Sequence, residues 1–276
     1  ARLFLSTPSR QGLPWPDSPA RSRLRDWPDP CEFRYNLPVV ESLEHPSPLV
    51  DLVNALLGPL GVHAPDYLVF CALIVMFLAG LGVYIKSRLS VDNPGTLQII
   101  LEDIVGFVVD NLENMMPHKG KKFLPLVGTV FIFILVGNLM GQIPGLGSPT
   151  SNVNVPFALA LVVWLYYHIE GVKAQGLGNY LLHFAFPPGV PKAMFLLMLP
   201  IEIISHASRV MSLTLRLFGN IFGEHLVVLI IGSIVPFLAP LPMQALGLIV
   251  GPLQAFIFML LAAIYLASAT AVDEHH

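Results

Sequence analysis

Long stretches without any charged side chain constrain this sequence more than any other feature. Residues 123–169 contain no Asp, Glu, Lys or Arg, and residues 193–272 contain only four such side chains. Charged residues make up 12% of the whole chain, whereas ordinary soluble domains carry about 25%. A water-soluble protein with so little charge would expose large apolar patches, which soluble monomers avoid. The sequence therefore predicts a membrane protein.

Five apolar stretches are each long enough to cross about 30 Å of hydrocarbon as a helix. They comprise residues 67–85, 123–140, 153–169, 193–235 and 243–269. Loops rich in proline and glycine occur at 141–152, 187–191 and 236–242. We therefore predict an all-α membrane protein with five membrane helices.

Lysine and arginine near the ends of these spans predict the orientation, since basic loops stay on the cytoplasmic side. Basic residues follow the first span, precede the second, follow the third and precede the fourth; they are Lys86, Arg88, Lys119, Lys121, Lys122, Lys173 and Lys192. The loops at 141–152 and 236–242 carry no charge. The amino terminus is therefore expected outside and the carboxyl terminus inside.

The first 60 residues differ from the rest and are expected to form a separate polar segment ahead of a membrane domain at 61–276. Six arginines of residues 1–66 would lie on the outer side, but eight acidic residues offset them, and long tails translocate with little regard to charge. Residues 1–30, rich in Pro, Arg and Ser, are typical of a processed leader or a misplaced start. We expect a leader or a poorly ordered stretch here, without a function of its own.

The sequence between the first two spans predicts an amphipathic helix over residues 94–116, with Asn93 as its N-cap and Pro94 at its first position. Its apolar stripe consists of Leu97, Leu101, Ile104, Val108, Leu112 and Met115, and the opposite face carries Glu102, Asp103, Gly106, Asp110 and Glu113. We expect this helix on the inner membrane surface. Because an acidic face does not favour anionic lipid, a protein partner is the better candidate for that face.

The fourth apolar segment is too long for an upright helix. Residues 192–235 would extend about 66 Å as a helix, about twice the thickness of the hydrocarbon core. Such an excess of hydrophobic length implies a strongly inclined helix held by a partner.

Six polar or ionisable side chains of this segment share one face. At about 100° per residue they fall within about 80° of arc; they are Glu202, His206, Arg209, Arg216, Asn220 and Glu224. Charges inside a membrane cost at least about 2.5 kcal/mol each and persist where they are paired or line a pathway. The four charges of this stripe therefore need a common explanation.

Structural salt bridges within the stripe are one explanation, since Arg209 lies within two turns of Glu202. Arg216 is similarly close to Glu224. However, fourteen residues separate Glu202 from Arg216, about 21 Å of helix axis, so these two cannot pair directly. A single arginine at mid-depth, with carboxylates toward each end of the stripe, is typical of a guarded proton path. Arginine suits the barrier because it does not deprotonate at physiological pH.

Two motifs resemble the signature of the a subunit family of rotary F-type ATP synthases. The first is SLTLRLFGN, residues 212–220, followed by IFGEHLVV; the second is QAFIFMLLAAIYLA, residues 254–267. The segments NLM and NVN fit the paired helices upstream. The resemblance runs from about residue 67 to the end and leaves residues 1–60 outside.

The resemblance implies a stator that couples proton flow to ATP synthesis, with 61–276 as its ion-translocating domain. A long, inclined hairpin at 192–235 and 242–270 would wrap a rotating ring of c subunits. Protons would enter an outer half-channel, travel on an acidic residue of the ring and leave by an inner half-channel. An essential arginine between the channels, Arg216 by motif, would block direct leakage.

Residue by residue, the resemblance assigns Glu202 to the inner half-channel, with His206 as a supporting group. It assigns to the outer half-channel Asn138, Asn220, Glu224, His225 and Gln254. Members of the family usually carry a carboxylate or a histidine nine residues after the arginine, which is His225 here, but this chain also has Glu224. We favour Glu224, since it lies in line with Arg216 on the stripe, and both stay candidates.

The resemblance also implies the partners, which are the c-subunit ring, the b subunits of the peripheral stalk, other ATP synthase subunits and membrane lipid. It implies no cofactor and no catalysis by this chain alone, in keeping with the lack of a P-loop, an HExxH or a GxSxG motif. The net charge of −3 argues against nucleic acid as a partner. We expect a multi-pass protein of a bacterial plasma membrane rather than of a mitochondrion or plastid.

A secondary transporter is the main alternative function, because a midplane arginine can bind an anionic substrate. Such a protein is expected to show internal repeats, and none is evident in the sequence. A membrane hydrolase is disfavoured by the missing motifs, and a static scaffold would not explain the ionisable stripe.

Overall fold

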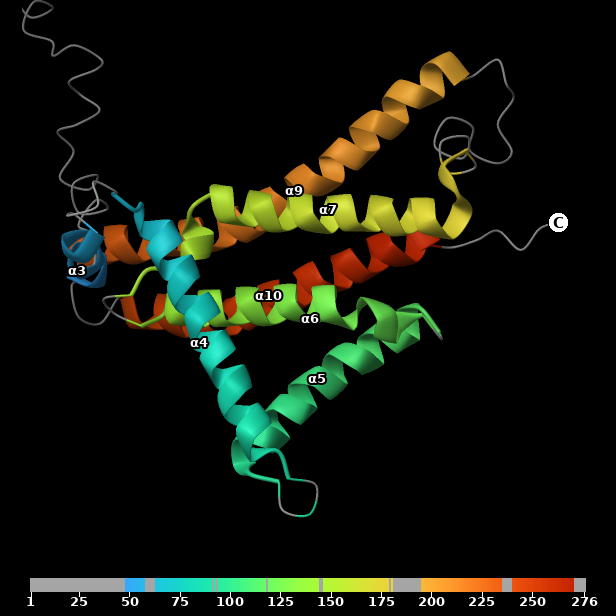
Figure 1. Ribbon diagram of the computed structural model, residues 1–276. Coiled ribbons are helices and arrows are strands. Elements are labelled where there is room, and N and C mark those ends of the chain that lie inside the picture. The colour runs from blue at the N-terminus through green and yellow to red at the C-terminus, as the bar shows by residue number, and fades with distance from the viewer. Residues whose placement is uncertain are drawn as a thin grey trace, which may run out of the picture. The chain divides into compact units, whose positions relative to one another are not determined.

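The computed structural model describes residues 48–57, 63–90, 92, 94–117, 119–143, 146–178, 180, 195–234 and 240–270, which all belong to the unit Pro46–His276. Within these ranges the regular elements are all helical: α3 Pro48–Leu57, α4 Asp66–Arg88, α5 Thr96–Met115, α6 Gly120–Met140, η2 Pro149–Ser151, α7 Asn154–Gln175, α9 Phe195–Ile234 and α10 Pro240–Thr270 (Figure 1). The predicted all-α class is confirmed. The predicted boundary at residue 60 stays a prediction, since residues 1–47 lie outside the described part.

Five helices are long and apolar enough to cross a membrane, as the sequence predicted. They are α4, α6 and α7 in full, Pro200–Ser233 of α9 and Leu241–Thr270 of α10. The third span was predicted to end at residue 169, but α7 continues to Gln175. It continues because Glu170 is buried and paired, with the Lys122 and Lys173 ammonium groups both bound to its carboxylate. A buried charge is tolerated where such partners are present.

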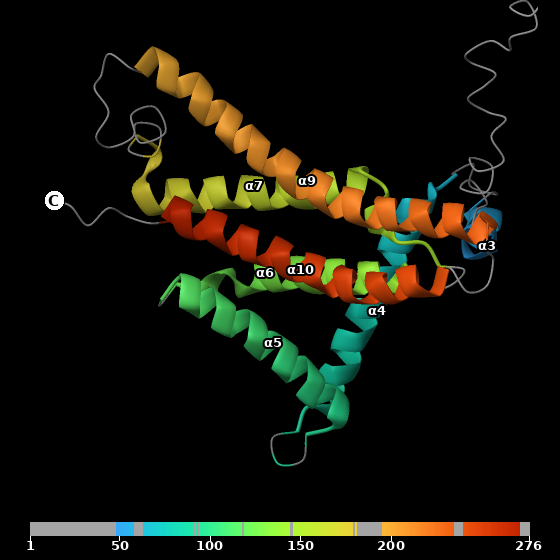
Figure 2. The same ribbon diagram turned by 180° about the vertical axis from the view of Figure 1, so that it is seen from behind.

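The helices α6, α7, α9 and α10 form the core of the described unit, and α10 contacts each of the other three, while α7 and α9 also contact each other. In Figure 1 and from behind in Figure 2, α6, α7 and α10 run side by side, while α9 diverges from α7 toward its own N-terminal end. Small buried side chains of α10, such as Ala255, Ala262 and Ala263, let the neighbouring helices approach closely.

The helix α4 crosses the direction of α6 and α7 rather than running along them (Figure 1). It contacts α6 and η2 near its N-terminal end, where Val69, Phe70 and Ile74 are buried with Met140. Most of its surface is exposed, because the other described helices cover little of it. A membrane helix in this position meets lipid or a partner chain over most of its length.

The predicted amphipathic helix begins at Thr96 rather than Pro94, and the predicted cap Asn93 lies outside the described residues. Gly95 is the N-cap, because its backbone is extended (φ −70°, ψ 155°) and its carbonyl accepts the Ile99 N–H at 3.1 Å. Of the predicted apolar stripe, Val108 and Leu112 are buried in the main core. The part of the stripe from Ile104 to Met115 therefore packs against protein, whereas Leu97 is exposed; whether α5 lies on the membrane surface stays a prediction.

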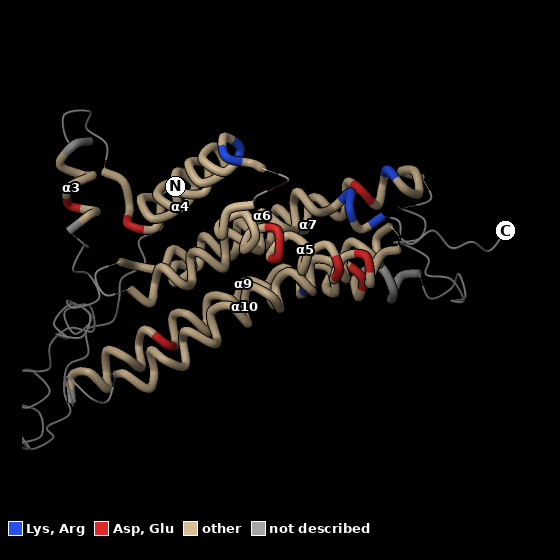
Figure 3. Tube along the Cα trace, turned by 90° about the horizontal axis from the view of Figure 1, so that it is seen from below, with Lys and Arg blue, Asp and Glu red and all other residues tan. Residues whose placement is uncertain are grey.

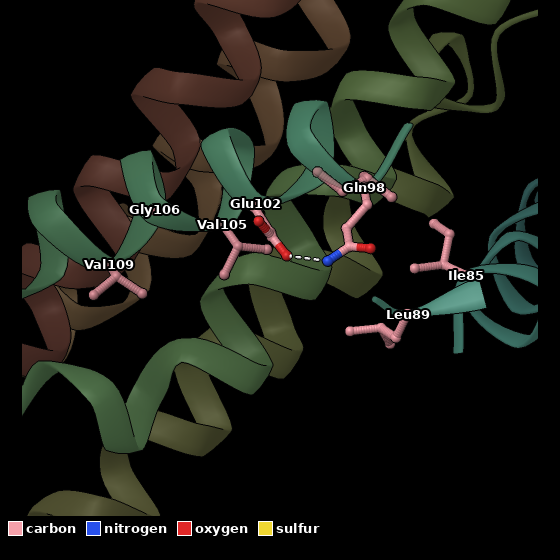
Figure 4. Close-up of a pocket in the computed structure, with 8 residues that line it drawn as sticks. Ile85, Leu89, Gln98, Glu102, Val105, Gly106 and Val109 are labelled. Carbon is pink, nitrogen blue, oxygen red and sulfur yellow. Dashed lines mark hydrogen bonds between the residues drawn. The ribbon is translucent and has the colours of Figure 1, made fainter. Parts of the chain in front are cut away.

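An apolar pocket of about 400 Å³ lies where α4 ends and α5 begins (Figure 4). Its walls include Ile85 and Leu89 on one side and Val105 and Val109 on the other, with a hydrogen bond from the Gln98 side chain to Glu102 nearby. None of the predicted site residues lines this pocket. The predicted site residues lie instead on α9 and on the helices around it.

Apart from Arg209 and Arg216 within α9, the described Lys and Arg residues lie at or next to the ends of helices (Figure 3). Lys86 and Arg88 occupy the last turn of α4, and Lys121 and Lys122 the first turn of α6, while Lys173 occupies the last turn of α7. The opposite ends of α6 and α7 carry no Lys or Arg. The orientation was predicted from these same basic residues, with the basic ends on the inner side, and it stays a prediction.

Candidate functional site

Arg216 lies on a face of α9 that the other described helices leave open. The buried positions of this part of α9 are Leu213, Leu217 and Ile221, which recur every four residues and join the main core. Arg216 is offset from them and exposed, as is its neighbour Leu215. The described residues provide no ion pair for the guanidinium. The packing of α9 thus presents a permanent positive charge at an open surface.

One turn further along α9, Asn220 is joined to α10. Its Nδ2 donates a hydrogen bond to the Oε1 of Gln254 at 2.8 Å. Gln254 is only 2% exposed, and its Nε2 has no hydrogen-bond partner in the described part of the chain. Residues four apart on a helix are neighbours, so this amide pair lies next to Arg216. The structure therefore brings together three residues that the sequence predicted for one site.

The side chain of Asn138 links α6 to the following loop and to α10 through hydrogen bonds. Its Nδ2 donates to the backbone carbonyl of Gly251 at 3.0 Å, and its Oδ1 accepts a hydrogen bond from the Thr150 hydroxyl at 2.7 Å. The Ser148 hydroxyl, 2.7 Å from that of Thr150, binds the Gly137 carbonyl at 3.1 Å. Both the nitrogen and the oxygen of the Asn138 side-chain amide thus have hydrogen-bond partners. Its predicted part in the outer half-channel stays a prediction, while its structural contacts are plain.

Glu224 is half-buried, two turns beyond Arg216 on α9. Its Oε1 accepts a hydrogen bond from the Nε2 of Gln142 at 2.8 Å, a contact between residues 82 positions apart. Its neighbour His225 is also half-buried, and its ring makes no hydrogen bond with the described residues. Gln142 was not predicted, because its sequence neighbourhood, a Gly- and Pro-rich loop, indicates only a turn.

At the end of the stripe that is predicted to lie on the inner side, three side chains form a hydrogen-bonded chain. The Nε2 of His206 lies 3.2 Å from the Oε1 of Glu202, and its Nδ1 lies 2.7 Å from the Tyr167 hydroxyl. A neutral imidazole carries one N–H donor and one acceptor. If Nε2–H donates to the carboxylate, Nδ1 accepts the tyrosine proton, so the chain runs from Tyr167 through His206 to Glu202.

Arg209 does not form the salt bridge with Glu202 that the sequence suggested as one explanation of the charges. Glu202 is paired with His206 instead, and the Arg209 guanidinium lies over the Tyr265 ring at 5.1 Å from its centroid. A cation over an aromatic face is attracted by the ring quadrupole. A salt bridge between Arg209 and Glu202 therefore does not account for the charges of the stripe.

Further aromatic and imidazole groups surround this inner chain. The ring of His168 meets that of His206 at 5.0 Å, and its Nδ1 lies 2.8 Å from the carbonyl of Trp164. The Tyr180 ring lies 6.1 Å from that of His168. Burial raises the pKa of the Tyr180 hydroxyl; Arg209 lowers it by a smaller amount, and Glu202 raises it further. The Tyr180 hydroxyl is therefore neutral at physiological pH.

Tyr167 and His168 were not predicted as site residues. They lie on the third span, 39 and 38 positions before His206, and the available signal was a Tyr-Tyr-His run at the inner end of an apolar helix. That run does not indicate which ring faces α9. The described residues contain no group of three or more His, Cys, Asp and Glu side chains able to hold a metal ion.

Comparisons with known proteins agree with one another. The family model described as "ATP synthase A chain" matches residues 67–267. A protein of Citrifermentans bemidjiense named "ATP synthase subunit a" is 44% identical over 226 residues, which cover 80% of this chain and 96% of the relative. Proteins of the same name from Campylobacter jejuni (43% over 206 residues; 74% and 87% covered) and Geotalea uraniireducens (41% over 235 residues; 84% and 99% covered) are similar as well.

Proposed function

Because the chain belongs to the ATP synthase A chain family, we propose that it conducts protons past Arg216, between two half-channels, beside a rotating ring of c subunits. It is a multi-pass membrane subunit that works with other ATP synthase subunits, and it is not catalytic by itself. Proton flow through it would drive rotation of the ring and, in other subunits, ATP synthesis.

The open position of Arg216 carries this proposal. A permanent charge inside a membrane costs at least about 2.5 kcal/mol and persists where it meets a counter-charge or a water-filled path. The described residues supply no counter-charge, although carboxylates are present on the same helix. A ring of partner carboxylates passing the open face of α9 would supply one repeatedly. The exposed apolar side chains that precede the arginine on α9, Met211 and Leu215, suit a sliding contact with apolar helices.

Two separate polar groups flank the arginine on α9. The outer group consists of Asn220, Gln254, Glu224 and Gln142, and the inner chain consists of Glu202, His206 and Tyr167. Along α9 Arg216 is about 21 Å from Glu202 and about 12 Å from Glu224. We assign proton uptake to the outer group, with Glu224 preferred over His225, and release to the inner chain. Arg216 would prevent direct passage between them, because it cannot relay a proton itself.

The b subunits of the peripheral stalk are proposed as partners beside the c-subunit ring, and no cofactor is required. Residues 61–276 form the proposed ion-translocating domain. The similar proteins come from Citrifermentans, Campylobacter and Geotalea, which favours the bacterial plasma membrane over a mitochondrial or plastid membrane.

The substitution Arg216→Ala tests the proposal in the assembled complex. In inverted membrane vesicles we expect proton-driven ATP synthesis to be abolished while the subunit remains in the purified complex. Arg209→Ala is the matched control, since it removes the same charge from the same helix at a side chain that lies over Tyr265; it should retain measurable synthesis. Normal coupled synthesis in the Arg216→Ala complex would refute the proposal.

A further inference from the structure

Three elements meet at the carboxylate of Glu224. Gln142, in the turn after α6, donates its side-chain N–H to the carboxylate at 2.8 Å. The backbone of Gln142 is itself held by the end of α6, because its N–H binds the Leu139 carbonyl at 3.1 Å. The amide is thus presented from a defined backbone position. Gly247 of α10 closes the third side of the carboxylate.

Gly247 is buried at the point where the two side chains meet. A Cβ at this position would overlap the Glu224 carboxylate and lie 2.6 Å from the Gln142 Nε2. Every other residue type has a Cβ, so any substitution would displace the carboxylate or the amide. The atoms that a methyl group would strike belong to these two side chains and not to a neighbouring backbone. The missing side chain therefore makes room for the hydrogen-bonded pair.

Gly251, one turn further along α10, provides a comparison within the same helix. It is also buried, but a Cβ there would lie 3.3 Å from the Cβ of Asn138. A shift of a few tenths of an ångström relieves that contact. Close packing of helices is thus enough to explain why position 251 is a glycine. At position 247, in contrast, the Glu224 carboxylate lies directly against the glycine.

We propose that Gln142 and Gly247 are positioning residues that seat the Glu224 carboxylate in the outer half-channel, Gln142 through its hydrogen bond and Gly247 through the space it leaves. This inference rests on the proposed function. It also identifies the seated carboxylate, rather than the adjacent imidazole of His225, as the group whose position the tertiary structure controls.

The substitution Gly247→Ala is the first test, in the assembled complex in inverted membrane vesicles. Displacing a reacting group by about 1 Å lowers a rate by about a hundredfold, so we expect a loss of that order in passive proton conduction through the membrane sector. Gly251→Ala is the matched control and should conduct within a few-fold of the parent. Equal conduction by the two variants would overturn the proposal.

A second substitution that restores proton conduction would distinguish a positioning role of Gly247 from a role in helix packing alone. Glu224→Asp withdraws the carboxylate by one methylene, about 1.5 Å, which makes room for the alanine methyl group. The double variant Gly247→Ala with Glu224→Asp should therefore conduct better than Gly247→Ala alone. If Gly247 only served helix packing, shortening the carboxylate would restore nothing, and that result would contradict the proposal.

Gln142→Leu provides a test that leaves α10 unchanged. Losing a hydrogen bond to a charged group costs about 1.5 kcal/mol or more, about tenfold in rate, and we expect a loss of proton conduction of that order. If Gln142→Asn and Gln142→Glu conduct no better than Gln142→Leu, the result supports a carboxylate held in one fixed position. Conduction at the parental level in Gln142→Leu would oppose it.

Arg216→Ala separates failure of this inference from failure of the proposed function. If Arg216→Ala abolishes coupled synthesis while Gly247→Ala and Gln142→Leu conduct normally, the positioning role of Gln142 and Gly247 is wrong and the proposed function stands.

Discussion

The two polar groups that flank Arg216 on α9 are built from different chemistry. The inner group is a continuous chain of a phenol, an imidazole and a carboxylate, those of Tyr167, His206 and Glu202. The outer group holds the Glu224 carboxylate and three amides, those of Gln142, Asn220 and Gln254. One group is made mainly of side chains that titrate, and the other mainly of side chains that do not.

This difference determines how each group can handle a proton. Imidazole and carboxylate gain and lose protons, and a tyrosine hydroxyl both donates and accepts, so the inner chain is able to relay a proton along side chains. Amides only orient and hydrogen-bond. Within the outer group, only the Glu224 carboxylate is therefore able to carry a proton. We expect the outer path to fail when that carboxylate is lost and the inner path to weaken when any link is broken.

The largest effect is expected from the outer carboxylate. Glu224→Ala should lower proton-driven ATP synthesis by about a hundredfold or more, because a positioned acid–base group contributes at least that much. His225→Ala should leave most of the activity, since its ring makes no hydrogen bond with the described residues. Both variants are measured in inverted membrane vesicles with the amount of assembled complex held equal. The reverse order would transfer the uptake role to His225.

A smaller effect is expected from one link of the inner chain. Tyr167→Phe removes the hydroxyl that binds His206 and should lower proton conduction by about tenfold. Tyr166→Phe is the matched control, because that ring meets Phe123 edge-on at 6.3 Å and lies outside the chain. Conduction is measured in membranes stripped of the ATP-synthesising sector. Equal conduction by the two variants would show that Tyr167 is not a link in the release path.

The smallest effect is expected at a hydrogen bond that holds Asn138 in place without taking part in proton transfer. Thr150→Val removes the hydrogen bond to Asn138, and buried hydrogen bonds in membrane proteins contribute about 0.6 kcal/mol on average. The purified complex should release this subunit at a slightly lower temperature, with proton conduction unchanged. Thr129→Val is the control, since that exposed hydroxyl binds only within its own helix, at the Pro125 carbonyl. A large loss of proton conduction in Thr150→Val would show that the hydrogen bond between Thr150 and Asn138 belongs to the proton path.

Much of the architecture and part of the site could be predicted from the sequence. The five spans and the polar stripe on α9 follow from local patterns, and two motifs assigned Asn220 and Gln254 to the same half-channel. The structure adds that these two side chains, 34 positions apart, are hydrogen-bonded to each other. Gln142 could not be found in this way. It lies 82 positions from Glu224, in a loop whose composition indicates only a turn.

The sequence by itself determined which elements form and which face of α9 is polar, because helix length and helical periodicity are local properties of the chain. Only the tertiary structure decided which side chains of other helices meet that face. The rotation and axial shift of α6, α7 and α10 against α9 depend on how buried residues such as Leu213, Leu217, Phe258 and Ala262 fit together. That fit brings Tyr167 to His206 and Gln142 to Glu224, and no local pattern encodes it.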